Sequence, residues 1–222
     1  MITSGLTATD VGKIECRVCI GGGIQQGSVD MKLTNDTVVE RVETFCYLGD
    51  MLSSDGGCEH AVISRINKAW NKFRELKPVL YAKGVSLKVK GRVYVTCVRS
   101  CMIYGGETWA VSAETERKLE RTEMRMVRFM CGVSLRDKCT NSDLRNRLGI
   151  DSIVDAVRRS RLRWFGHVKR KADEDWVKRC TTMEVEGRRG RGRPRRTWTD
   201  VVKSDLRRLN IKREDAQNRS LW

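Results

Sequence analysis

The chain of 222 residues lacks a long hydrophobic run and contains only two prolines. Its apolar stretches fall far short of the ~20 residues that a membrane-spanning helix needs, so we expect no membrane segment. The N-terminus has neither a basic start nor an apolar core, and a secretory signal is therefore not expected. The scarcity of proline favours long helices, because proline breaks helix interiors.

Sequence signatures of common enzymes are also missing. The chain has no Walker loop, no Gly-x-Ser-x-Gly elbow and no His-Glu-x-x-His zinc motif. Its one dense acidic cluster, at residues 173–175, lies among lysines at 169, 171 and 178, which favours a salt-bridged helix start over a metal site. We therefore expect no catalytic residues and no cofactor in this chain.

The nine cysteines occur at irregular spacing. Without a secretory signal, we expect reduced thiols in a protein of the nucleus or cytoplasm. Cys16-x-x-Cys19 has metal-ligand spacing, but a structural zinc needs four ligands. Only Cys46 follows within about thirty residues, and His60 is isolated. Cys16 and Cys19 are therefore the only metal-ligand candidates, and a zinc site is disfavoured.

Positive charge is concentrated in the later part of the chain. The net charge is +16, from 44 Lys and Arg against 28 Asp and Glu. Residues 1–57 contain four basic and eight acidic side chains, so residues 58–222 carry +20. A one-sided basic excess is typical of proteins that bind the nucleic-acid backbone. The alternative is a solvated, highly charged helical surface, and charge alone does not decide between the two.

Hydrophobic periodicity divides the chain into four parts. Residues 1–28 are small, glycine-rich and aperiodic, which predicts a disordered or truncated N-terminus. Residues 29–57 contain β-prone runs and end in an Asp-Gly-Gly turn, which predicts a small hairpin or sheet remnant. Residues 58–149 and 150–222 follow a helical period. We therefore predict a mainly α fold: a β remnant, a helical bundle and a basic helical tail.

Apolar stripes and capping residues mark the individual helices. The first stripe is Val62, Ile63, Ile66, Ala69, Trp70, Phe73 and Leu76. Further starts are expected at Ser86, Ser112, Asn141, Ser152 and Asp173, with stops at Gly132 and Gly149. In the helix after Ser86, Cys97 and Cys101 fall in the apolar stripe. Thr197–Asp200 resembles a capping box and opens a helix whose stripe is Trp198, Val201, Val202, Leu206 and Leu209.

The strongest local motif is Gly187–Arg196, in which six of ten residues are arginine and none is acidic. Its glycines keep the backbone thin enough for a narrow groove, where negative potential favours arginine. Arg191–Pro194 resembles an AT-hook, but the match is short, so a general phosphate clamp is the favoured interpretation. The candidate contacts are Arg188, Arg189, Arg191, Arg193, Arg195 and Arg196.

A second basic patch lies on the helix predicted after Ser152. Its candidate nucleic-acid contacts are Arg158, Arg159, Arg161 and Arg163. Trp164 and Phe165 follow directly; aromatics beside arginine can stack on bases, but a core role is favoured for both, with phosphate contact for some of the arginines. For His167, packing or hydrogen bonding is favoured over catalysis, because no carboxylate lies at motif spacing.

Several motifs together resemble the region that follows the active site in LINE-type (non-LTR) retrotransposon reverse transcriptases. In order, they are Phe45–Asp50, an Asp-Gly turn, Arg65-Ile66, Tyr104–Trp109, Arg128–Gly132, Arg163–His167, and Gly192–Pro194 with Trp198. The resemblance covers residues 38–222. Its ordered series, at the family's spacing, is far more specific than any single match.

The resemblance implies roles that composition does not supply. Tyr47, Leu48 and Gly49 match the primer-grip hairpin, which holds the primer's 3′ end. The following helices resemble the thumb, which packs on the template–primer duplex. The basic C-terminal part would contact template RNA, target DNA or an RNA/DNA hybrid. Some relatives carry a Cys/His-rich insertion near the position of Cys16 and Cys19, of which this pair would be a remnant.

The chain departs from that family in the residues that perform its chemistry. The polymerase needs carboxylates, including a pair in a Tyr-x-Asp-Asp-type turn, which hold two Mg²⁺ ions. This chain has no Asp-Asp dipeptide and lacks the fingers, most of the palm and the endonuclease. We therefore expect no polymerase activity from the chain alone, and Mg²⁺ would be needed only by the intact polymerase.

Three functional interpretations remain at this point. The first is a non-catalytic reverse-transcriptase fragment that binds RNA, DNA or their hybrid. The second is a basic chromatin or RNA-binding module that a host derived from such a fragment. The third is a helical interaction protein whose basic face meets an acidic partner. The sequence indicates no oligomeric state.

Overall fold

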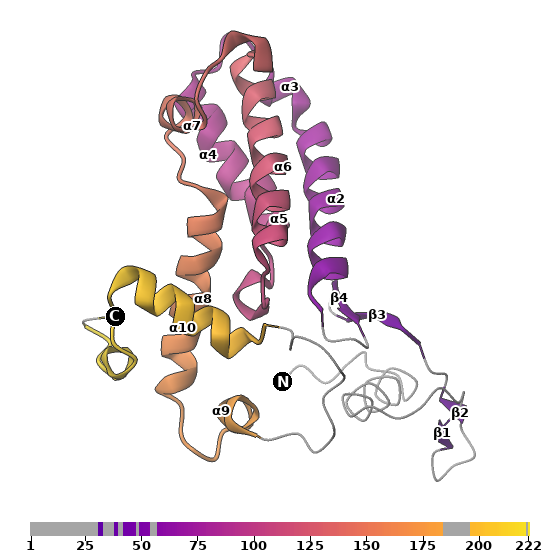
Figure 1. Ribbon diagram of the computed structural model, residues 1–222. Coiled ribbons are helices and arrows are strands. Elements are labelled where there is room, and N and C mark those ends of the chain that lie inside the picture. The colour runs from indigo at the N-terminus through magenta and orange to yellow at the C-terminus, as the bar shows by residue number, and fades with distance from the viewer. Residues whose placement is uncertain are drawn as a thin grey trace, which may run out of the picture. The chain divides into compact units, whose positions relative to one another are not determined.

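The computed structural model describes residues 31–32, 38–39, 42–47, 49–53, 57–183, 196–220 and 222. The chain divides into two compact units: Met1–Gly57 with Thr182–Arg195, and Cys58–Thr181 with Arg196–Trp222. The fold is mainly helical, with small antiparallel strand pairs near the N-terminal side (Figure 1). The predicted fold class is thus confirmed.

Short strands form the regular structure described in the first unit. β1 (Met31–Lys32) pairs with β2 (Val38–Val39), and β3 (Thr44–Tyr47) pairs with β4 (Asp50–Ser53), both antiparallel. Between β3 and β4, Gly49 has a φ of 78°, which glycine adopts without strain because it has no Cβ. Residues 1–28 and the turn at 54–56 lie outside the described residues.

The described elements of the second unit are helices. The longer ones are α2 (Glu59–Glu75), α4 (Leu87–Val93), α6 (Ala113–Cys131), α7 (Asn141–Leu148), α8 (Ile153–Lys169), α9 (Trp176–Thr182) and α10 (Trp198–Leu209). The shorter ones are α3 (Lys77–Leu80), η2 (Tyr94–Arg99), α5 (Ser100–Met102), η3 (Gly106–Thr108), η4 (Leu135–Asp137) and η5 (Glu214–Gln217). Within the described ranges, no helix combines the length and apolar character needed to cross a bilayer.

Local capping chemistry sets the helix ends where the sequence predicts them. Ser86 and Ser112 accept hydrogen bonds from the backbone N–H groups of Val89 and Thr115. Gly132 and Gly149 end α6 and α7 in the left-handed conformation. Thr197 and Asp200 form the predicted capping box of α10. All these helix starts and stops depend only on neighbouring residues.

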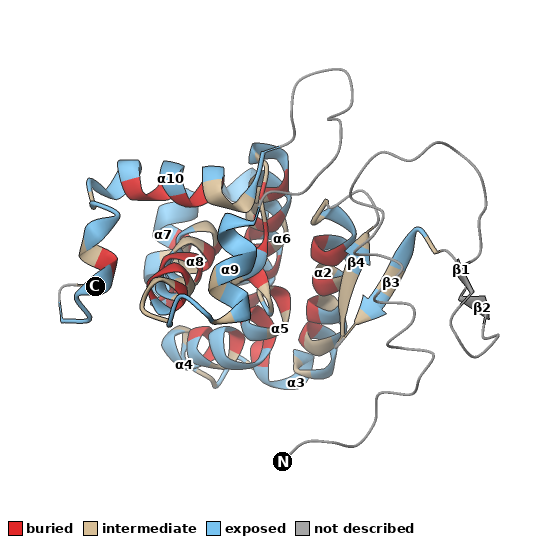
Figure 2. Cartoon of the chain, turned by 90° about the horizontal axis from the view of Figure 1, so that it is seen from below, coloured by how far each residue is buried: buried red, intermediate tan, exposed pale blue. Residues whose placement is uncertain are grey.

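The core of the helical unit lies between α2, α4, α6 and α8, whose buried faces are visible in Figure 2. The apolar face of α6 is buried, at Leu119, Met126, Val127 and Met130. On α2 the predicted stripe is largely confirmed, since Val62, Ala69 and Phe73 are buried. Ile63 is exposed instead, and Ala61 and Arg65 are buried in addition.

The apolar stripe predicted for the helix after Ser86 is wrong at its two cysteines. Residues Tyr94–Arg99 form a π-helical stretch, whose wider turn rotates the following side chains relative to an α-helix. Cys97 is therefore exposed and Cys101 is half-buried, while Lys90 and Arg99 are buried. The expectation that both cysteines pack in the core is thus corrected.

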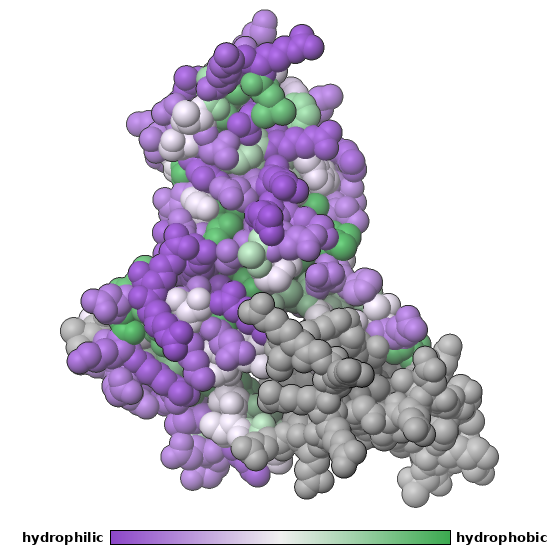
Figure 3. Space-filling model, viewed as in Figure 1, coloured by the Kyte–Doolittle hydropathy of each residue, from purple (hydrophilic) through white to green (hydrophobic). Residues whose placement is uncertain are grey.

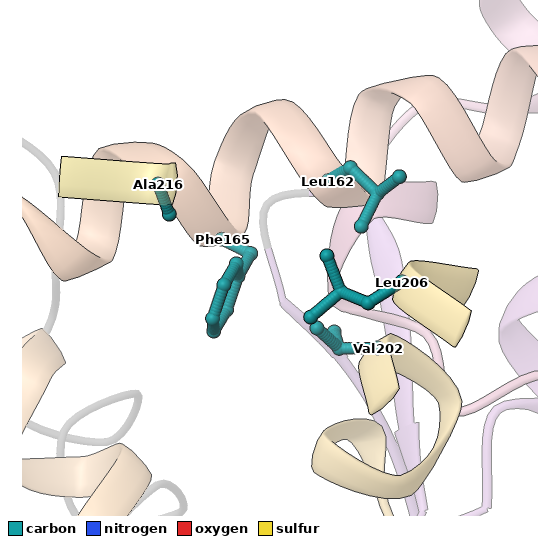
Figure 4. Close-up of a cluster of buried hydrophobic side chains, with 5 residues drawn as sticks. All are labelled: Leu162, Phe165, Val202, Leu206 and Ala216. Carbon is teal, nitrogen blue, oxygen red and sulfur yellow. The ribbon is translucent and has the colours of Figure 1, made fainter. Parts of the chain in front are cut away.

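A separate apolar cluster joins α8 to the C-terminal part of the chain. Leu162 and Phe165 of α8 meet Val202 and Leu206 of α10 and Ala216 of η5 (Figure 4). Leu209, the last residue of α10, is exposed instead of completing the predicted stripe. This cluster anchors α10 and the C-terminal residues beside the basic segment of α8.

Candidate nucleic-acid interface

Arg161 of α8 is a core residue. Its side chain is 0% exposed, and its Nε donates a 2.8 Å hydrogen bond to Asp205 Oδ2. Its Nη1 donates to the backbone oxygen of Trp109 at 3.3 Å. Because the whole guanidinium is enclosed, it cannot contact a phosphate in this structure. The predicted nucleic-acid contact at Arg161 is therefore corrected to a structural role.

Arg158 is surrounded by carboxylates. Its Nη2 lies 3.1 Å from Glu116, its Nη1 lies 3.0 Å from Asp155, and its Nε lies 3.6 Å from Asp205. The side chain is only 15% exposed. It links α6, α8 and α10, and its charge is balanced inside the protein. Arg158 is thus also a structural residue rather than a free contact for an anion.

The start of α8 is held by a second buried charge network, centred on Glu123 of α6. Glu123 is fully buried and lies 2.6 Å from Arg99 and 3.4 Å from Arg145. Its Oε2 accepts a hydrogen bond from the first backbone N–H of α8, at Ile153. Burial raises the pKa of Tyr94, whose hydroxyl donates to Glu123 Oε1. Together these contacts fix where α8 begins.

Arg159 lies on the exposed face of α8. Its Nη2 is 2.6 Å from Asp151, and both side chains are more than half exposed. Exposed pairs of this kind contribute little, because water and salt screen them. Arg159 can therefore exchange Asp151 for an anionic ligand at small cost.

Arg163 lines a hollow of about 700 Å³ beside the C-terminal half of α8. The lining residues are Glu107, Ser160, Arg163, Trp164, His167, Arg170, Arg219 and Trp222. In Figure 3, hydrophilic side chains dominate the visible surface over α8 and α10. We call this feature the α8 hollow.

The α8 hollow is strongly positive. Three arginines line it against one carboxylate, Glu107. Among the described residues, Arg163 and Arg219 have no hydrogen-bond or ion-pair partner, and Arg170 donates one bond to the backbone oxygen of Ala216 at 2.7 Å. Guanidinium groups present planar arrays of donors that match phosphate oxygens. The hollow is therefore suited to an anion such as a phosphodiester.

Aromatic rings complete the lining of the α8 hollow. The rings of Trp164 and His167 are tilted by 33° to each other, with their centroids 5.4 Å apart. Trp222 reaches back to α8, where its Nε1 donates a 3.1 Å hydrogen bond to the backbone oxygen of Leu162. Rings beside cations can stack on nucleic-acid bases while the cations hold the backbone.

Gly166 makes room for Trp222. A Cβ placed at Gly166 would lie 2.3 Å from Trp222 Nε1, so any larger residue would displace the ring. Trp222 also contacts Phe165, with centroids 5.9 Å apart. The glycine between Phe165 and His167 is thus explained by this close approach.

Positive charge is crowded at the end of α8. Burial, and then the neighbouring Arg213, lowers the pKa of Lys169. Lys169 also lies over the Phe165 ring, with Nζ 6.0 Å from the centroid. An anion bound nearby would relieve this repulsion, which adds to the preference of the region for negative ligands.

Other predicted site residues lie elsewhere. Tyr47 ends β3 opposite Asp50, and Gly49 lies in the turn, so a hairpin stands where the resemblance expects one. Arg196 is exposed just before α10. Outside the described residues lie Cys16, Cys19, Leu48, Arg188, Arg189, Arg191, Arg193 and Arg195. Across the described ranges, no three His, Cys, Asp or Glu side chains gather as a metal site would require.

The sequence prediction missed several residues of the α8 hollow. Arg170 carries a usable signal, since it follows Arg163 by seven residues and so shares its helix face. The sequence gives no such signal for Arg219 and Trp222, because only tertiary folding brings them to α8. Also missed were the arginines of α6 at 117, 121, 125 and 128, although their spacing of three to four residues marks one helix face.

Comparison with known proteins links the chain to a mobile element. It is similar to a putative uncharacterized transposon-derived protein of Caenorhabditis elegans, with 22% identity over 182 residues. The similarity supports a transposon-related origin. It covers 78% of this chain but 63% of that protein, so the chain spans less than two thirds of its relative's length. No protein-family model and no solved structure matches the chain.

Proposed function

We propose that this chain is a non-catalytic part of a non-LTR retrotransposon reverse transcriptase, and that it binds RNA, DNA or their hybrid. The observation that carries the proposal is the α8 hollow, where Arg163 and Arg219, which have no partner among the described residues, lie beside Trp164, His167 and Trp222. The net charge of +16, the ordered motifs and the transposon-derived relative also support it. The nucleus and the cytoplasm are both consistent with this role.

The proposed binding mode combines two kinds of contact. Arg163, Arg170 and Arg219 hold phosphate oxygens, and the rings of the hollow stack on unpaired bases. The Arg/Gly segment at 187–196 adds backbone contacts, and the hairpin at Tyr47–Gly49 adds contacts to a primer end. Such a mode favours single-stranded nucleic acid over a closed duplex, because stacked bases are inaccessible within a duplex.

The proposed function includes no nucleotidyl transfer. The carboxylates that would hold two Mg²⁺ ions in a complete polymerase have no counterpart in this sequence. Primer extension with Mg²⁺ and all four deoxynucleotides should therefore yield no product. Incorporation above that of a heat-inactivated sample would refute the non-catalytic part of the proposal.

Fluorescence anisotropy tests the binding part of the proposal. Labelled single-stranded RNA, single-stranded DNA, duplex DNA and hybrid are titrated with the protein at several salt concentrations. We expect binding to weaken linearly on a log–log plot, with a slope of about −0.7 per phosphate contact for single strands. No binding to any of the four at low salt would refute it.

Paired variants locate the interface. Arg163→Gln with Arg219→Gln should reduce affinity and make the salt slope shallower by about one to two contacts. Lys83→Gln with Lys88→Gln is a matched control, since it removes two exposed charges outside the hollow. An unchanged slope in the double variant, with binding retained, would place the contacts away from the α8 hollow.

A further inference from the structure

A second hollow lies beside α6, and its lining differs in chemistry from that of the α8 hollow. It has a volume of about 580 Å³ and lies along α6 from Arg117 onward and along the segment that follows. Its lining residues are Arg117, Glu120, Arg121, Met124, Arg125, Arg128, Phe129, Val133, Ser134, Leu135 and Asn141. We call this feature the α6 groove.

One side of the α6 groove is a row of cations. Arg117, Arg121, Arg125 and Arg128 span about 16 Å of the helix at 1.5 Å per residue. Among the described residues, none of the four is paired with a carboxylate. The one acid in the lining, Glu120, is already held by Arg145 at 3.0 Å. Arg117 donates to the backbone oxygen of Ala113, and Arg128 donates to the backbone oxygen of Met124 and to Asn141 Oδ1, all of which are neutral acceptors. The charge of the row is therefore not balanced by a carboxylate of the described residues, and it can meet several negative charges at once.

The other side of the α6 groove is apolar and exposed. Leu135 is 79% exposed and Phe129 is 43% exposed, while Met124 and Val133 lie deeper. In Figure 3, hydrophobic residues appear among hydrophilic ones at the upper end of the helical unit, near the end of α6. Exposed apolar groups gathered beside a charged rim are typical of protein interaction sites.

Leu135 is held in its exposed position by local hydrogen bonds. Ser134 and Asp137 form a capping box around η4, with the Ser134 backbone N–H 2.6 Å from Asp137 Oδ2. The capping hydrogen bonds lower the pKa of Asp137. A preformed anchor of this kind reduces the ordering cost of binding.

Aromatic packing supports the floor of the α6 groove from behind. Phe129 stacks on Tyr81 with centroids 6.3 Å apart and meets the edge of Trp70 at 6.3 Å. Arg125 lies over the Trp70 ring, 5.6 Å from its centroid. The apolar floor and the cationic row are thus parts of one packed surface.

We infer that the α6 groove binds an acidic amphipathic peptide segment of another protein. The four arginines match carboxylates spaced one helical turn apart on a partner helix, and Phe129, Val133 and Leu135 receive its apolar side chains. A phosphodiester backbone would satisfy the arginines but would leave the aliphatic side chains without a partner. The combination of both linings therefore favours a peptide over nucleic acid at this surface.

The probe is a fluorescein-labelled synthetic peptide of about 15 residues, long enough to form a helix on binding. Leucine recurs every three or four residues, and glutamate fills the flanking positions. We expect saturable binding to the complete chain, measured by fluorescence anisotropy. A second peptide with serine in place of each leucine should bind at least about tenfold more weakly.

Variants of the chain assign the binding to the α6 groove. Leu135→Ser should weaken peptide binding about tenfold, because it removes the exposed anchor. Arg121→Gln should weaken it about threefold and reduce its salt dependence. Arg163→Gln, in the α8 hollow, should leave it unchanged. Circular dichroism checks that each variant is folded. If Leu135→Ser destabilises the chain, Arg121→Glu replaces it, because it reverses a charge of the groove and should also weaken peptide binding.

Two outcomes would overturn the inference. Equal binding of the serine-containing peptide, or no effect of Leu135→Ser, would show that apolar contacts do not contribute. Failure of the leucine peptide to bind, together with weaker oligonucleotide binding by Arg121→Gln, would assign the α6 groove to nucleic acid instead. The peptide-binding tests do not depend on nucleic-acid binding at the α8 hollow, so they can succeed or fail whatever the outcome for the proposed function.

Discussion

Neighbouring arginines of α8 have the same chemistry but opposite surroundings. Arg158 and Arg161 are enclosed by Glu116, Asp155 and Asp205, which balance their charges inside the protein. Arg163, two residues further along the helix, faces solvent without a carboxylate partner among the described residues. The comparison shows that the accessibility of an arginine to an anion depends on where the acids lie, and not on how many arginines a helix carries.

The largest effect is expected from Asp205→Asn. Asp205 is almost fully buried and balances Arg161, so its removal leaves a buried charge unpaired at a cost of about 3–5 kcal/mol. Urea unfolding measures the loss. Asp151→Asn is the matched control, since Asp151 pairs with exposed Arg159 and should change stability by less than about 0.5 kcal/mol. Equal losses in both variants would contradict the distinction between the enclosed and the exposed arginines of α8.

A smaller effect is expected when each arginine becomes lysine. Arg161→Lys keeps the charge but cannot satisfy both Asp205 and the Trp109 backbone, so we expect a loss of about 2 kcal/mol. Arg163→Lys should alter stability by less than about 0.5 kcal/mol, because the Arg163 side chain is exposed and has no hydrogen-bond or ion-pair partner among the described residues. Thermal unfolding distinguishes the two. Comparable losses would mean that Arg163 is also structural.

What could be predicted from the sequence follows the range of the interactions. The caps at Ser86, Ser112 and Thr197 and the stops at Gly132 and Gly149 are local, and all are confirmed. Ser152 does precede α8, but its side chain makes no cap; the buried carboxylate of Glu123, 30 residues away, accepts the first N–H. A distant cap leaves no pattern in neighbouring residues.

The site could be predicted only in part for the same reason. Arg163 was predicted from the basic patch, and it does line the α8 hollow. Trp164 lines it too, although the sequence favoured a core role for that ring. Arg161 looked equivalent to Arg163, because its partner Asp205 lies 44 residues further on. The π-helical stretch at residues 94–99 likewise leaves Cys97 exposed rather than in the apolar stripe, without any local signal.

Gly166→Ala tests how the C-terminal part of α8 packs against Trp222. The new methyl group must displace Trp222, so we expect a loss of about 1–3 kcal/mol from overpacking, measured by urea unfolding. In a Trp222→Ala background the same substitution should stabilise by about 0.5–1 kcal/mol, because alanine favours a helix over glycine. Gly84→Ala, with open space around its Cβ, is the control. The same loss in both backgrounds would show that Trp222 does not occupy this position.

The smallest effect concerns Asp200, an exposed acid that acts locally rather than through burial. Hydrogen bonds from the Thr197 hydroxyl and backbone N–H lower its pKa below the ordinary value. Because the folded form holds the ionised carboxylate, this contribution is present above the ordinary pKa and is lost as pH falls through the lowered value. The Tm of the protein should therefore exceed that of Asp200→Asn at about pH 6, and the difference should shrink by about pH 2. A constant difference over that range would mean that the cap works through hydrogen bonding alone, whereas convergence would assign its strength to the charge.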